Sequence, residues 1–251
     1  MRQSRILAVA VGLALAAAGA PAAADKPKWG YEGPFGPAQW GKLGADHALC
    51  GTGRAQSPID LASANAEASV VISTDYRPDT LTVLNDGHTV QFNIGNGSTL
   101  VAGGMTFELV QVHFHTPAEH AIGDRTFPLE AHFVHRSATG QLAVIGVMVV
   151  AGEANPSLAA LLRHLPMRES TAQTHPDTVI DPNGLMPADH GLFRYMGSLT
   201  TPPCSEGVHW HVMAATVTAS TAQIEMLGRA MGSNARPVQA ANDRLIVAPA
   251  R

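Results

Sequence analysis

Three histidines in two apolar segments are the residues of this chain best suited to chemistry. In residues 109–115, His113 and His115 alternate with apolar side chains, and His132 does the same in residues 129–135. Residues two apart on a β-strand point to the same face, so two neighbouring strands would bring the three imidazoles together. Three neutral imidazole nitrogens around one point suit a catalytic zinc ion, Zn²⁺, that keeps its fourth position open.

Two polar residues share the faces that carry these histidines. Gln111 precedes His113 by two positions, and Glu130 precedes His132 by two positions. Each could accept the second ring N–H of a ligand histidine and so fix its tautomer. A lone histidine on an apolar strand is usually a core residue, whereas three histidines with polar partners favour a metal site.

The first residues predict export. A basic start is followed by an apolar stretch over residues 6–18 and by the small residues Ala22-Ala23-Ala24. This order is typical of a secretory signal peptide, residues 1–24, cleaved near Ala24. The apolar stretch is too short for a membrane anchor. We therefore expect a periplasmic or secreted protein with one catalytic domain, residues 25–251.

The charge argues against two classes of partner. The whole chain has 16 Lys and Arg against 20 Asp and Glu. Removal of Arg2 and Arg5 with the signal peptide leaves 14 against 20, a net charge of −6. Such a chain has no basic face for nucleic acid, and it has no second apolar span for a membrane. A small-molecule substrate is expected, and a homodimer is compatible with the sequence.

The two cysteines, Cys50 and Cys204, are expected to form one disulfide. Oxidation is favoured outside the cytoplasm, and a bridge between these positions would close a long loop. The alternative is two free thiols.

Short apolar runs and the 24 Gly and 17 Pro residues predict a predominantly β fold of the α+β kind, with a few short helices. Residues 141–150 are almost wholly apolar and predict a central buried strand. Helices are expected after Asn155, as a cap before Pro156, and after Ser220, which forms a capping box with Gln223.

Two connections complete this outline. Gly95-Asn96-Gly97 predicts a hairpin that joins strands at residues 88–94 and 98–102. Residues 174–190 are rich in Pro and Asp and are expected to form a loop.

An ordered set of motifs resembles the alpha-class carbonic anhydrases over essentially the whole chain after the signal peptide, and the bacterial members in particular. The motifs are Trp40-Gly41-Lys42, Gln56-Ser57-Pro58-Ile59-Asp60, Leu84-Asn85-Asp86-Gly87-His88, Gln111-Val112-His113-Phe114-His115, Glu119-His120, Leu129-Glu130-Ala131-His132-Phe133-Val134-His135, Gly197-Ser198-Leu199-Thr200-Thr201-Pro202-Pro203 and residues 234–237.

This resemblance implies a central, twisted, mostly antiparallel sheet of ten strands, with zinc held by His113, His115 and His132. The implied reaction is the reversible hydration of carbon dioxide to bicarbonate and a proton by zinc-hydroxide attack. It also implies cis peptide bonds before Pro58 and Pro203.

The resemblance further assigns roles around the metal. Thr200 would donate its hydroxyl proton to Glu119 and orient the attacking oxygen, and His88 would carry the product proton to solvent. Carbon dioxide is apolar, so its site should be a hydrophobic wall beside the metal. The positions that match the family assign this wall to Val134, Val144, Leu199 and Trp210.

Two other functions remain open on the sequence. His113-x-His115 followed by Glu119 resembles half of a cupin motif, in which Glu119 would be a ligand to iron or manganese. Alternatively, the chain could be a non-catalytic binding module on the carbonic anhydrase fold, although such modules lose zinc histidines and all three are present here.

Overall fold

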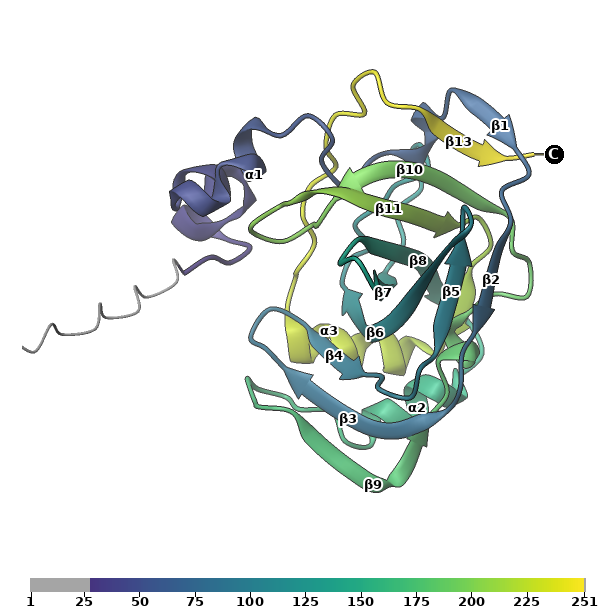
Figure 1. The fold of residues 1–251 in the computed structure, drawn as a ribbon. Coiled ribbons are helices and arrows are strands. Elements are labelled where there is room, and N and C mark those ends of the chain that lie inside the picture. Colours follow the sequence, from purple (N-terminus) through teal and green to yellow (C-terminus); the bar gives the residue numbers. More distant parts are fainter. Residues whose placement is uncertain (1–27, 251) are drawn as a thin grey trace, which may run out of the picture.

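The alternating apolar residues of the chain form one large twisted sheet, which runs through the centre of the molecule (Figure 1). The structure is a computed structural model, and it describes residues 28–250. The strands are β1 (Ala66–Ala68), β2 (Ile72–Asp75), β3 (Asp79–Asn85), β4 (Val90–Asn93), β5 (Thr99–Ala102), β6 (Met105–His115), β7 (Leu129–Ser137), β8 (Leu142–Ala151), β9 (Gln173–Ile180), β10 (Leu192–Ser198), β11 (Glu206–Met213), β12 (Val217–Ala219) and β13 (Ile246–Pro249).

Ten of these strands pair in the order β1-β13-β10-β11-β8-β7-β6-β4-β3-β9, while β2, β5 and β12 pair outside this path. Most neighbours are antiparallel; β1 with β13, and β8 with both β11 and β12, are parallel. The prediction of a predominantly β domain around a twisted, mostly antiparallel sheet is confirmed. The cis bonds expected before Pro58 and Pro203 are present, and a third precedes Pro117.

The helices are few and short, as expected. They are α1 (Leu49–Thr52), α2 (Pro156–Leu162) and α3 (Thr221–Met231), with 3-10 turns at Gly33–Phe35, Pro37–Lys42, Ala45–His47, Leu61–Ser63 and Pro182–Leu185. Asn155 caps α2 by accepting from two backbone N–H groups, and the Ser220–Gln223 capping box begins α3. The two longer helices contact each other, and α3 also contacts β4.

A β-bulge decides which face of β6 carries the histidines. The pairing of β6 with β7 shifts between Leu109 and Gln111, so that the two positions oppose adjacent residues of β7. Leu109 therefore points into the core, where it is 1% exposed, while Gln111 and the positions that alternate after it point to the other face. Without the bulge, Leu109 would point to the same face of the sheet as Gln111 and the histidines.

The prediction of a hairpin at Gly95-Asn96-Gly97 is wrong. β4 and β5 do not pair with each other; both pair with β6, one after the other along its length. The loop between them is held open by Asn96, whose Nδ2 donates to the carbonyl oxygens of Arg77 and Pro78 and whose side-chain oxygen accepts from Ser98. These bonds replace the tight turn that the Asn-Gly pair predicts.

The prediction of a loop at residues 174–190 is also partly wrong. Residues Gln173–Ile180 form β9, which pairs only with β3 at the edge of the sheet. Proline is tolerated at a sheet edge because the missing N–H is not needed there. Pro176 lies where the pairing with β3 shifts, between the partners of Thr80 and Leu81. Composition alone suggested a loop, and the edge position explains why a strand forms.

The predicted signal peptide lies outside the described residues. Within residues 28–250, no helix is long and apolar enough to cross a membrane.

Two histidines lie on the core side of the sheet, away from the predicted site. His135 is fully buried: its Nδ1–H donates to the Ala143 carbonyl, and Tyr76 donates to its Nε2 at 2.8 Å. His211 is 1% exposed, and no described residue bonds its Nδ1. Burial lowers the pKa of His135 to about 3 and that of His211 to about 4. Both rings are therefore neutral in the folded protein at neutral pH.

These neutral rings should make the protein sensitive to acid. Below the ordinary histidine pKa of about 6.5, the unfolded chain binds protons that the folded chain does not. The free energy of unfolding should therefore fall with decreasing pH by about 1.4 kcal/mol per unit for each such histidine, between about pH 6 and pH 4.

His211→Leu should keep the fold and reduce the slope of the free energy of unfolding against pH by the contribution of about one proton. The measurement is urea unfolding at several pH values, for both proteins in the same metal state. Parallel curves for the two proteins would contradict the assignment to His211.

Candidate metal centre

The bulge on β6 and the antiparallel pairing with β7 bring the three predicted ligands together. His113 lies directly opposite His132 in the register, and His115 shares the face of His113. The centres of the three rings lie 4.6–5.2 Å apart. One nitrogen from each ring falls in a group whose atoms all lie within 4.8 Å of one another, a spacing that suits a single metal ion.

The other nitrogen of each ring is already committed to an acceptor. The Nδ1–H of His113 donates to Gln111 Oε1 at 2.9 Å, and the Nδ1–H of His115 donates to the Asn234 carbonyl at 2.8 Å. The Nε2–H of His132 donates to Glu130 Oε1 at 2.9 Å. The inward nitrogens are then unprotonated, and each presents a lone pair. They are His113 Nε2, His115 Nε2 and His132 Nδ1.

This arrangement fits a bound cation. His113 Nε2 and His115 Nε2 lie 3.0 Å apart, and neither carries a proton to share when both Nδ1 atoms donate elsewhere. Two lone pairs at this distance repel each other unless a positive charge lies beside them. Three nitrogen donors with fixed tautomers also match the ligand set of catalytic zinc.

The surroundings keep the rings uncharged. Burial lowers the pKa of His113 well below 6.5, that of His115 to about 4, and that of His132 below its ordinary value. Neutral imidazole is the form that binds metals, so the ligands need lose no proton at neutral pH.

Glu130 is the acceptor at the centre of this network. Its Oε1 accepts from His132 and from His120 Nδ1, and its Oε2 accepts from the backbone N–H groups of Glu119 and His120 at 2.9 Å. Burial raises the pKa of Glu130, but His120 and His132 outweigh that effect and hold the pKa well below its ordinary value. His120, Glu130 and His132 could also form a metal group, but these hydrogen bonds already use their facing atoms.

Glu119 lies beside two of the histidines, with 3.5 Å between its Oε1 and His115 Nδ1 and 3.9 Å between its Oε2 and His132 Nδ1, and the Thr200 hydroxyl lies next to its carboxylate. Glu119 Oε1 accepts from the backbone N–H of Arg236 at 2.9 Å, while no hydrogen bond of standard geometry reaches its Oε2 from the described residues. Burial raises the pKa of Glu119 to about 7, although His132, Arg236 and the Thr200 hydroxyl each act to lower it. Glu119 belongs to neither group of potential ligands, which argues against the cupin arrangement.

The predicted hydrophobic wall forms one cluster next to the metal ligands. Val144 and Trp210 are buried in it, and Val134 and Leu199 pack against it. The Trp210 ring lies 4.9 Å from the His132 ring between centres, and its N–H donates to the Ser198 carbonyl. Trp210 thus brings this cluster into contact with the ligand His132.

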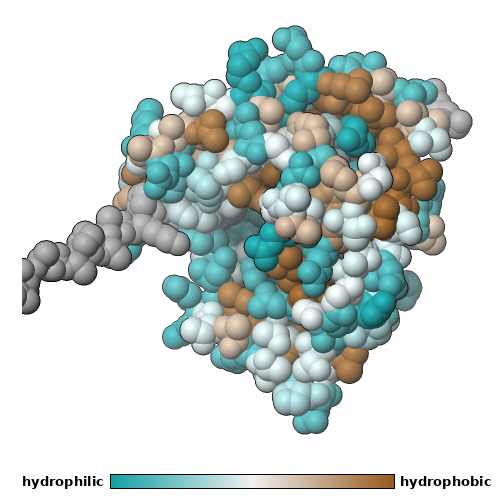
Figure 2. Space-filling view, in the orientation of Figure 1, coloured by the Kyte–Doolittle hydropathy of each residue, from teal (hydrophilic) through white to brown (hydrophobic). Residues whose placement is uncertain are grey.

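His88 lies at the outer part of the same cleft. Its ring stacks on Trp29 with 3.6 Å between the centres and 10° between the planes. Both residues line a cavity of about 110 Å³ that also includes His113 and His115. The space-filling view shows a hollow between the N-terminal segment and the body of the sheet (Figure 2). The structure thus places the half-buried His88 in the same cavity as two of the three ligand histidines.

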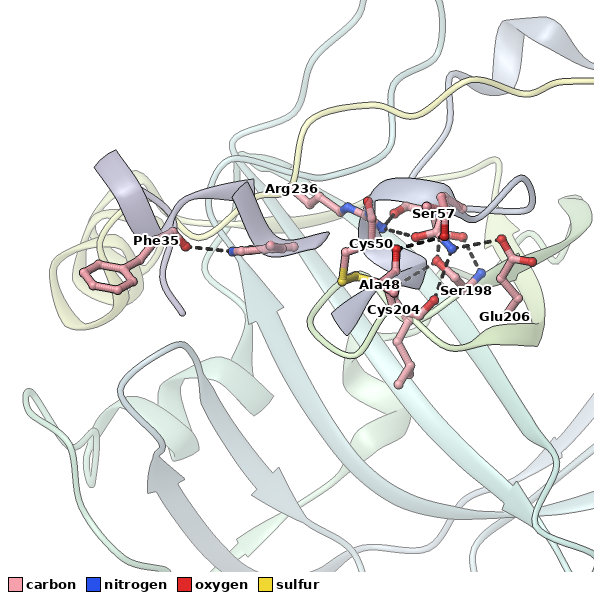
Figure 3. Close-up of a disulfide and its surroundings, with 12 residues drawn as sticks. Phe35, Ala48, Cys50, Ser57, Ser198, Cys204, Glu206 and Arg236 are labelled. Carbon is pink, nitrogen blue, oxygen red and sulfur yellow. Dashed lines mark hydrogen bonds between the residues drawn. A yellow bond between two sulfur atoms is a disulfide. The ribbon is translucent and has the colours of Figure 1, made fainter. Parts of the chain in front are cut away.

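The predicted disulfide between Cys50 and Cys204 is confirmed (Figure 3). It ties α1 to the segment that follows β10, on which Thr200 lies. Arg236 lies beside it, where its guanidinium donates to the carbonyl oxygens of Cys50 and Ser57. The disulfide and Arg236 therefore fix the loops around the centre without touching the ligands.

Two residues of this site had no role in the sequence prediction. Asn234 supplies the acceptor for His115, and Arg236 supplies the N–H that binds Glu119. Both act through their backbone here, so their side-chain types carry no signal of it. Only the motif at residues 234–237 marked this segment.

Comparisons with known proteins of similar sequence and fold identify the family of this chain. The sequence model of eukaryotic-type carbonic anhydrases matches residues 35–250. A carbonic anhydrase from Nostoc sp. is 44% identical over 90% of this chain and 88% of its own length. The alpha-carbonic anhydrase from Thermovibrio ammonificans, solved with the inhibitor sulfanilamide, is 40% identical with a TM-score of 0.85, over 88% of this chain and 99% of that one.

Dioscorin, solved in complex with ascorbate, is also similar, with 34% identity and a TM-score of 0.81 over 88% of this chain and 97% of that one. The fold therefore occurs in proteins of other names, but the match of the family model and of the bacterial enzymes extends over nearly the whole chain. On these grounds, the chain belongs to the eukaryotic-type, or alpha, family of carbonic anhydrases and is an enzyme of that family.

Proposed function

We propose that the protein catalyses the zinc-dependent, reversible hydration of carbon dioxide to bicarbonate and a proton. The observation that carries this proposal is the set of three converging lone pairs on His113, His115 and His132, each fixed by an acceptor on its far side. Zinc bound there would supply a water that loses its proton near neutral pH, at the value of about 7 known for carbonic anhydrases as a class.

The protein residues then position the reactants. Thr200, whose hydroxyl lies next to the Glu119 carboxylate, donates its hydroxyl proton to Glu119 Oε2 and uses its own oxygen to orient the nucleophile. The free lone pairs of Oε2 leave it available for this bond. Val134, Val144, Leu199 and Trp210 bind carbon dioxide through apolar contact, since the molecule offers little to hydrogen-bond.

His88 accepts the proton that each turnover releases and passes it to solvent. Its half-buried ring lines the same cavity as two of the ligands, and an imidazole can accept a proton on one nitrogen and then release it. The disulfide suits an oxidising compartment. We infer a periplasmic or secreted location after cleavage near Ala24.

Removal of the metal tests the central assignment. Metal analysis should give one zinc per chain, and stopped-flow measurement should show carbon dioxide hydration that a chelator abolishes and added zinc restores. His115→Ala should lose zinc, because two nitrogens bind the ion far more weakly than three. A metal-free protein with full activity, or an enzyme loaded with iron instead, would contradict the proposal.

Thr200→Ala should lower kcat/KM for carbon dioxide by roughly a hundredfold, the scale of losing one preorganised hydrogen-bonding group. Zinc content should stay the same, because Thr200 is not one of the three ligands. Thr200→Ser, which keeps the hydroxyl, is the matched control and should retain most of the activity. Equal rates for the wild-type and alanine enzymes would remove this role.

His88→Ala should slow kcat in weak buffer by on the order of tenfold or more, because proton export loses its acceptor. The value of kcat/KM should change little, and added imidazole should restore kcat. His190→Ala removes an exposed histidine on another surface and should leave the rate unchanged. A slow enzyme that imidazole does not rescue would argue against the shuttle.

A further inference from the structure

The side chain of Asn234 joins two segments of the site that are far apart in sequence. It is fully buried just after α3. Its Oδ1 accepts from the Thr116 N–H at 2.7 Å, and its Nδ2 donates to the carbonyl oxygens of Phe114 and His88, both at 3.0 Å. One amide therefore holds the end of the ligand strand and the main chain of the proposed shuttle.

This role is separate from the contact that Asn234 makes with a ligand. The bond to His115 uses the backbone carbonyl of Asn234, which any residue would offer. The side chain instead needs one acceptor and two donors at once, directed at one N–H and two carbonyl oxygens. Among side chains of this size, only an asparagine amide supplies that combination.

Few other bonds fix the main chain of His88 relative to the ligands. Regular pairing of β4 with β6 begins only at Gln91, opposite His113. The Thr89 hydroxyl reaches the Phe114 carbonyl at 2.6 Å, which is the same oxygen that Asn234 binds. The His88 ring stacks on Trp29, which lies in the N-terminal segment and not in the sheet. The His88 N–H donates to Asp86 Oδ1 within its own turn, so among the described residues the Asn234 amide is the group that ties the His88 main chain directly to the ligand strand.

We propose that the Asn234 side chain is a positioning residue that sets the distance between the shuttle His88 and the metal ligands. This inference rests on the proposed function, in which His88 exports the proton. Proton transfer is sensitive to small displacements of its partners, so a loosened loop should slow export while the hydration step itself continues.

Asn234→Ala removes the tether and keeps the backbone carbonyl that binds His115. We expect unchanged zinc content, kcat/KM within about twofold of wild type, and kcat in weak buffer lower by about tenfold, with recovery on addition of imidazole. In the metal-free protein, amide hydrogen exchange in a peptide that covers residues 86–90 should be about tenfold faster, while exchange in β7 stays the same.

Asn155→Ala is the matched control. Asn155 is also buried, caps α2 and donates from Nδ2 to the Gly184 carbonyl, so its loss destabilises the protein at a place apart from the centre. It should change neither kcat nor exchange at residues 86–90. Where Asn234→Ala does not fold, Asn234→Ser leaves a smaller cavity and still cannot reach the His88 carbonyl.

Loss of zinc, or an equal fall in kcat and kcat/KM, would overturn the inference, because Asn234 would then act on the metal alone. Unchanged kcat and unchanged exchange would overturn it as well. Absence of hydration in the wild-type enzyme would overturn the proposed function and with it the proton-transfer role. The exchange comparison in metal-free protein would then still support or overturn the tether itself.

Discussion

The buried carboxylate of Glu130 organises the site. It accepts four hydrogen bonds, from two histidine rings and from two successive backbone N–H groups, and it has no contact with solvent. By accepting from His120 Nδ1 and His132 Nε2 it fixes the tautomers of both rings, and the backbone bonds hold the chain at Glu119. An isolated carboxylate would be costly at this depth, and the four donors offset that cost. Gly146 on the next strand makes room for it, since a Cβ there would lie 2.8 Å from Oε1.

The network extends from this carboxylate to the loops. His120 accepts from Tyr195 through Nε2, and the Tyr195 oxygen is bonded in turn to Ser57. Ser57 bonds β10 at Ser198, next to the loop that carries Thr200. The strands thus fix the ligands, and a continuous chain of polar contacts fixes the loops against the strands. A rigid arrangement of this kind is what catalysis by positioning requires.

The sequence predicted the residues of the centre better than their surroundings. Alternation in β6 and β7 was enough to bring His113, His115 and His132 together, because a period of two is a local property of strands. The bulge at Val110 was not predicted, since a bulge depends on the pairing partner.

The same reason explains the errors in the outer strands. β9 forms because β3 offers a free edge, and the loop after β4 is shaped by bonds to Arg77 and Pro78. The backbone acceptor at Asn234 has no side-chain signature at all. Local patterns report what a segment prefers, whereas these features depend on segments far away in the chain.

The disulfide also changes the unfolded state. Cys50 and Cys204 are 154 residues apart, and the histidines of the centre, Glu119, Thr200 and His88 all lie between them. In the chain-entropy description, closing a ring of this length raises the free energy of the unfolded chain by about 5 kcal/mol. The denatured, oxidised polypeptide is thus a closed ring that keeps its metal-binding groups in one bounded volume, whereas Asn234 and Arg236 belong to the free tail.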